Sequence, residues 1–96
     1  MEVVFHFKSE NYAKAKDILS SDDVVGRASM TFKEGTFIGK DGYYCYFSGT
    51  EDQCERAEKL VEELTEKVSD EEKSTLINKI KEEENKAIEG FGNILG

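Results

Sequence analysis

The sequence predicts a small α+β domain, a two-layer sandwich in which one mostly antiparallel sheet carries helices on one face. Apolar and polar residues alternate in segments 3–7 and 27–32, which is the spacing of strands. In other segments apolar residues recur every three or four positions, which is the spacing of helices. The chain has 96 residues, so we expect a single domain over residues 1–96.

Four strands are expected. The first is 3–7, with Val3, Phe5 and Phe7 on one side and Val4 and His6 on the other. The next are 27–32, the short segment 36–38 and the aromatic segment 43–48, separated by turns at 33–35 and 39–42. The alternative is one long strand, 28–38, with Gly35 as a bulge, which would leave three strands.

Three helices are expected, giving the order β-α-β-β-β-α-α. The first covers 10–20, with Ser9 as its N-cap. Thr50 and Gln53 form a capping-box pattern before the second helix, whose apolar stripe runs to Val68 over about five turns. A second capping box, 69–72, starts the third helix. Residues 90–96 form an apolar tail that either folds back onto the sheet or docks into another chain.

The predicted core joins one face of the sheet to the first two helices. Its strand residues are Val3, Phe5, Phe7, Ala28, Met30 and Phe32, and its helix residues are Ile18, Leu19, Leu60, Val61 and Leu64.

The formal charge of −8 is concentrated in residues 51–96, which hold 14 acids and 7 bases. Such a surface repels phosphate, so the chain is not expected to bind nucleic acid on its own. No apolar run has the length of a membrane helix and no signal peptide is seen, so we expect no membrane association. Cys45 and Cys54 match no metal or redox spacing, which favours a cytoplasmic location.

Catalytic signals are few. The single histidine, His6, lies within a strand, and Cys54 in the first turn of a helix is the one candidate for redox sensitivity. The glycines of turn 39–42 match no phosphate-binding loop. Consecutive glutamates such as 82–84 fan around a helix and do not converge on an ion. We therefore expect no enzyme, no metal and no cofactor.

The face of the sheet opposite the predicted core is the strongest indication of function in the sequence. It carries Tyr44 and Tyr46, and tyrosines are enriched at protein interfaces. We expect a non-enzymatic protein–protein interaction module that associates with itself as a homodimer or docks as a small subunit of a larger complex. The alternatives are an ordinary exposed sheet face and a regulatory domain that binds a small ligand between sheet and helices. The candidate interface residues, on this face and in the tail, are Val4, His6, Ile38, Tyr44, Tyr46, Phe91, Ile94 and Leu95.

Over residues 3–65 the chain resembles the small dimerisation subunit of the KEOPS tRNA-modification complex. The matching positions are Phe7-Lys8-Ser9-Glu10, Ala13, Arg27, Glu51-Asp52, Arg56, Leu60 and Leu64. The chain departs from the family's pattern in the added residues 37–42, in a more acidic long helix and in the extra segment 69–96. The resemblance implies a non-catalytic subunit that dimerises and bridges a catalytic partner.

Overall fold

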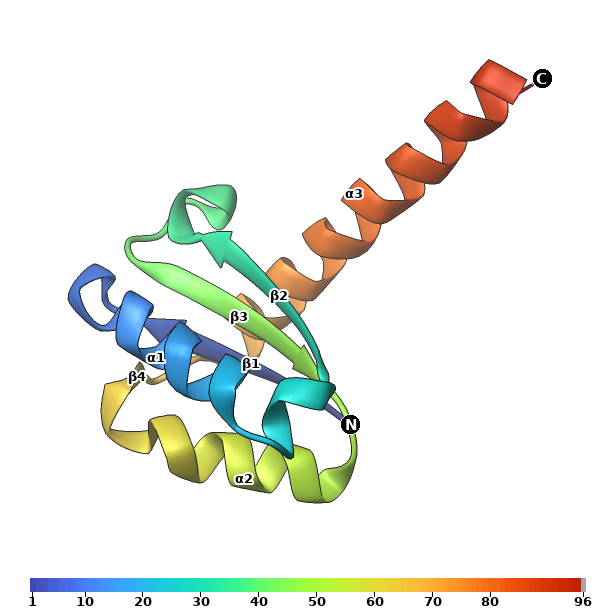
Figure 1. The fold of residues 1–96 in the computed structure, drawn as a ribbon. Helices are drawn as coiled ribbons and strands as arrows, with labels where there is room; N and C mark the ends of the chain where they lie inside the picture. Colours follow the sequence, from blue (N-terminus) through green and yellow to red (C-terminus); the bar gives the residue numbers. More distant parts are fainter. Residues whose placement is uncertain (96) are drawn as a thin grey trace.

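The computed structural model describes the backbone of residues 1–95 and the side chains of residues 1–85. It is an α+β domain with a four-stranded antiparallel sheet, so the predicted fold class is confirmed (Figure 1). The elements are β1 (Glu2–Phe7), α1 (Ser9–Ser21), β2 (Ser29–Glu34), β3 (Tyr43–Ser48), α2 (Glu51–Val61), β4 (Thr65–Glu66) and α3 (Asp70–Leu95). Short 3-10 helices cover Val25–Arg27, Gly35–Ile38 and Glu62–Leu64.

The strands lie in the order β2-β3-β1-β4, with every neighbouring pair antiparallel. The side chains of β1 alternate as predicted: Phe5 and Phe7 are buried against α1 and α2, and Val4 lies on the opposite side. We call the side that contacts α1 and α2 the first face, and the opposite side the second face.

The first-face core is close to the predicted one. Leu19 of α1 and Val61 of α2 are fully buried there, and Met30 and Phe32 of β2 pack at its edge. One member is wrong: Leu60 is exposed, because it lies beside the apolar stripe of α2. Arg56 of α2 donates to both carboxylate oxygens of Asp22, at 2.9 and 2.8 Å. Asp22 directly follows α1, so this ion pair connects α1 to α2.

The predicted strand at 36–38 is wrong, because this segment is part of the 3-10 helix Gly35–Ile38. The Gly35 N–H donates to the Gly42 carbonyl oxygen at 2.7 Å, so β2 pairs directly with β3 and the residues between them form its loop. The fourth strand of the sheet is instead β4, which pairs with β1 at His6 and Phe7.

The second helix is shorter than predicted. The Thr50 capping box is present, with bonds to Gln53 of 2.9 and 3.1 Å, but α2 ends at Val61. The chain then forms a 3-10 turn and β4 along the edge of β1, and Val68 reaches the second face.

The prediction that all helices share one face is wrong for α3. Leu76 and Ile80 of α3 pack on Val4 and Tyr44, so the first half of this helix covers part of the second face. Ser69 accepts the Glu72 N–H at 3.1 Å and caps the helix start, as expected. Beyond its contact with the sheet, the backbone of α3 extends away from the domain (Figure 1). Within residues 1–95, no helix combines the length and the apolar character needed to cross a membrane.

Candidate functional site

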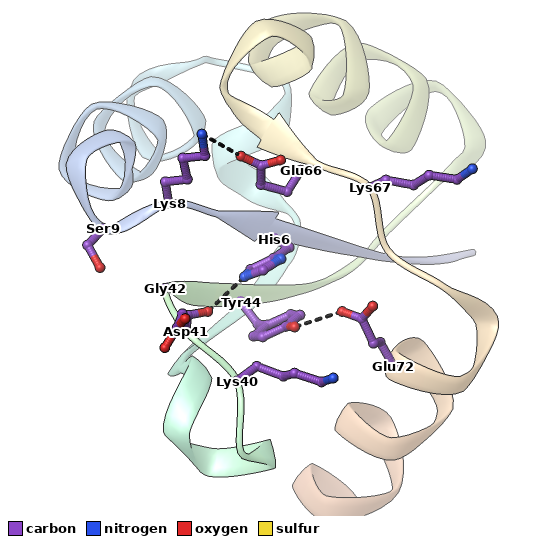
Figure 2. A pocket seen from close by; sticks show the side chains of 10 residues that line it. All are labelled: His6, Lys8, Ser9, Lys40, Asp41, Gly42, Tyr44, Glu66, Lys67 and Glu72. Atoms are coloured by element: carbon purple, nitrogen blue, oxygen red, sulfur yellow. Dashed lines mark hydrogen bonds and ion pairs between the residues drawn. The ribbon is translucent and has the colours of Figure 1, made fainter.

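A hollow of about 600 Å³ opens where α3 leaves the second face uncovered (Figure 2). It lies between the β1–α1 junction, the loop before β3, β4 and the start of α3. Its lining residues are His6, Lys8, Ser9, Lys40, Asp41, Gly42, Tyr44, Glu66, Lys67 and Glu72.

His6 lies at the centre of this hollow. Its Nε2 is 2.8 Å from the carbonyl oxygen of Asp41, and its ring stacks on Tyr44 with the centroids 4.2 Å apart. A carbonyl oxygen only accepts hydrogen bonds, so Nε2 carries the proton and Nδ1 of the neutral ring is an acceptor. His6 is therefore held in one orientation, in which its neutral form is the Nε2–H tautomer.

Tyr44 connects the hollow to α3. Its hydroxyl donates to Glu72 Oε2 at 2.8 Å, and Ser69 donates to the other carboxylate oxygen at 3.3 Å. Burial and the bond to Glu72 raise the pKa of Tyr44, and the same bond lowers the pKa of Glu72. At neutral pH the pair therefore stays as a phenol and a carboxylate.

The predicted interface residues fall into three groups. Val4 and Tyr44 are buried under α3, with 8% and 0% of their surface exposed, so they do not form an open contact surface. His6 lines the hollow. Ile38 and Tyr46 are half-buried at the rim of the second-face cluster, which is the buried group of Val4, Tyr44, Leu76 and Ile80. The Tyr46 hydroxyl donates to Glu2 at 2.5 Å, and this bond raises the pKa of Tyr46 to about 12.

The remaining predicted interface residues lie in α3. They are Phe91, Ile94 and Leu95, whose side chains lie outside the described residues. The backbone there is helical to Leu95, and the two predicted states of the tail stay predictions.

The outer edge of β2 is a second candidate site, and the sequence reading missed it by assigning Met30 and Phe32 to the core alone. The hydrogen bond from Gly35 to Gly42 lies at the end of the β2–β3 ladder. In an antiparallel pair only every second residue of a strand exchanges backbone hydrogen bonds with the neighbouring strand. Ser29, Thr31 and Lys33 therefore bond to β3, and the backbone groups of Met30, Phe32 and Glu34 point away from the sheet. Nothing else in the described chain pairs with this edge.

An aromatic cluster lies beside this edge on the first face. Tyr12 of α1 stacks on Tyr43 with centroids 3.8 Å apart and meets Phe32 edge to face at 6.0 Å. Lys16 lies 5.4 Å from the centre of the Phe32 ring. All three rings are half-buried, so an apolar surface continues from α1 to the free edge of β2.

Both cysteines are buried and reduced. Burial raises the pKa of the Cys45 thiol to about 12, and the Cys54 thiol lies 3.7 Å from the Met1 carbonyl oxygen. We expect Ellman's reagent at pH 8 to react with both thiols of the folded protein at least about 10³-fold more slowly than in denaturant. The reaction requires the protein to unfold locally or globally and expose the buried thiol. Rapid labelling that disappears in Cys54→Ser would instead identify Cys54 as a reactive thiol.

Among the residues whose side chains are described, no three His, Cys, Asp or Glu side chains come close enough to hold a metal ion. No family model, curated protein or solved structure matches this chain. The two candidate sites therefore carry the information on its function.

Proposed function

We propose that the chain is a non-enzymatic protein–protein interaction module that self-associates through the outer edge of β2. The observation that carries the proposal is the free backbone of Met30, Phe32 and Glu34 on a regular six-residue edge strand. Free edges of this kind template pairing with another strand, and proteins that stay monomeric usually protect them with proline, a bulge or an exposed lysine.

Proline, a bulge and an outward lysine are absent from β2. It contains no proline, and its pairing with β3 is continuous over all six residues. Its one lysine, Lys33, is bound to Glu83 of α3 at 2.7 Å and lies over the Phe37 ring. The Lys33 charge is thus held on the second face and does not guard the edge.

A second copy of the chain suits this edge. Two antiparallel β2 strands related by a twofold axis would place Thr31 opposite its own copy and Met30 opposite Phe32. The outward backbone groups of Met30 and Phe32 would bond across the axis, and the apolar surface beside each strand would continue into that of its copy. Cross-strand Thr–Thr and apolar pairs stabilise such a contact.

The resemblance to the KEOPS subunit family agrees with this proposal in one respect, since it too implies self-association. It adds the expectation of a catalytic partner bridged by the dimer, which co-purification from the native host would test.

Light scattering after size exclusion tests the proposal. We expect a dimer for the wild type and a monomer for Thr31→Lys, because two ammonium groups would face each other across the twofold axis. The dimer dissociation constant should rise at least about tenfold, which corresponds to about 1.4 kcal/mol of repulsion. The matched control is Thr31→Val, which keeps a β-branched side chain and should remain dimeric.

A cross-link tests the register. Thr31 and its copy would form a non-hydrogen-bonded pair with Cα atoms about 4.5 Å apart, within the range of a disulfide. Thr31→Cys should therefore oxidise to a covalent dimer, whereas Ser29→Cys, which faces Lys33 of the other copy, should not. A wild type that is monomeric at several hundred micromolar would overturn self-association.

A further inference from the structure

We propose that the hollow around His6 binds a small molecule that carries an oxyanion, either a carboxylate or a phosphate group. Its volume of about 600 Å³ lies within the range of small-molecule sites. Eight of its ten lining residues are ionisable, and they come from four separate parts of the chain. None belongs to β2, so this proposal is independent of self-association.

Two of the three acids of the hollow, Glu66 and Glu72, already have partners. Lys8 pairs with Glu66 at 3.3 Å. Both carboxylate oxygens of Glu72 accept hydrogen bonds, from Tyr44 and from Ser69. Figure 2 shows the side chain of Asp41 turned away from His6, toward the outside of its loop. Glu66 and Glu72 are therefore each held by a neighbouring group, and the Asp41 carboxylate lies away from His6.

Two lysines of the hollow remain available. The lysine hydrogen bonds and ion pairs of the described side chains involve Lys8, Lys33, Lys73 and Lys79. Lys40 and Lys67 are not among them, although the charge of Lys40 adds to the hydrogen bonds from Tyr44 and Ser69 in lowering the pKa of the Glu72 carboxyl. In Figure 2, Lys40 extends below Tyr44 toward Glu72, while Lys67 lies at the opposite rim and points outward. Lys40 is thus the main anion ligand, and Lys67 reaches the same group by rotating its flexible side chain.

The charge of the hollow differs from that of the chain. The whole chain carries −8, whereas the lining has three lysines against three acids, Asp41, Glu66 and Glu72. The negative charge of the chain as a whole repels an oxyanion, whereas the charges that line the hollow balance. Because Lys8 is paired with Glu66, the positive charges that remain for an anionic ligand are those of Lys40 and Lys67.

His6 supplies a preorganised polar contact. Its Nε2–H is used by Asp41, and no hydrogen bond in the described part of the chain uses Nδ1. Nδ1 of the neutral ring accepts a hydrogen bond, so it would contact a hydroxyl group beside a carboxylate or the protonated oxygen of a phosphate. The stack on Tyr44 and the bond to Asp41 hold the ring in place before a ligand arrives.

The single histidine of the chain gives a direct test by proton NMR. We expect inorganic phosphate and malate, titrated separately at constant pH and ionic strength, to shift the imidazole signals of His6 in a saturable way. The two titrations distinguish a phosphate site from a carboxylate site. Lys40→Gln should weaken the binding about tenfold and Lys67→Gln about threefold, as expected for charge-assisted contacts that are partly exposed.

The matched control is Lys81→Gln, which removes an exposed lysine of α3 outside the hollow and should leave binding unchanged. The proposal is overturned if neither anion shifts the imidazole signals beyond a sodium chloride control. It is also overturned if the shifts are the same in wild type and Lys40→Gln. Because Thr31→Lys leaves the hollow intact, the titration on that variant separates failure of this site from failure of self-association.

Discussion

Replacing Leu76 with alanine is expected to lower the free energy of unfolding by about 2–5 kcal/mol, the usual cost of truncating a buried leucine. Leu76 is fully buried between α3 and the second face, where it packs with Val4, Tyr44 and Ile80. The truncation removes apolar area and leaves a cavity beneath the helix. Urea unfolding followed by circular dichroism measures the change, with the slope of the transition checked for constancy.

Asn78→Ala is the matched control for Leu76→Ala. Asn78 lies two residues further along α3 and is exposed, so its replacement should change the free energy of unfolding by no more than about 0.5 kcal/mol. A loss below about 0.5 kcal/mol for Leu76→Ala would mean that α3 does not stabilise the domain. The second face would then be available as the open surface that the tyrosine pattern first indicated.

The side of the sheet that a helix covers could not be predicted here. The apolar spacing of Leu76, Ile77 and Ile80 correctly predicted a helix, but the same stripe would fit either face. The choice is made by β4, because the chain there runs along the edge of β1 and arrives on the other side. β4 is only two residues long, too short for an alternation pattern to indicate it.

Strands and turns were predictable where local chemistry dominates. The alternation in β1 and the Thr50 capping box depend on neighbouring residues, and both are confirmed. The segment 36–38 was misassigned because Phe37 and Ile38 are apolar for packing against residues distant in the sequence, not for pairing as a strand. They lie in a 3-10 turn and pack with the second-face cluster under α3.

The hollow illustrates a different limit. His6 was singled out because it is the only histidine, but its neighbours Lys40 and Glu72 are separated from it by 34 and 66 positions in the sequence. No motif connects residues so far apart, and each looks like an ordinary surface charge. Only the sheet order, with β1 between β3 and β4, brings them together.

Gly42→Ala is expected to lower the free energy of unfolding by about 2–5 kcal/mol, from two separate costs. Gly42 has φ +76°, a conformation that costs a residue with a side chain about 1–2 kcal/mol. A Cβ atom there would also overlap the backbone oxygen of Phe7, which cannot move without disturbing β1. Relieving such an overlap costs typically about 1–3 kcal/mol more.

Gly39→Ala separates these two costs. Gly39 belongs to the same loop and has a similar φ of +71°, but a Cβ atom there would meet nothing within 4 Å. Its replacement should therefore cost only about 1–2 kcal/mol, from the backbone conformation alone. Urea unfolding of both variants gives the difference, and equal losses would contradict the close approach of Gly42 to Phe7. Because the Cβ atom at position 42 would also lie 3.2 Å from His6 Nε2, Gly42→Ala, unlike Gly39→Ala, should shift the imidazole NMR signals of His6.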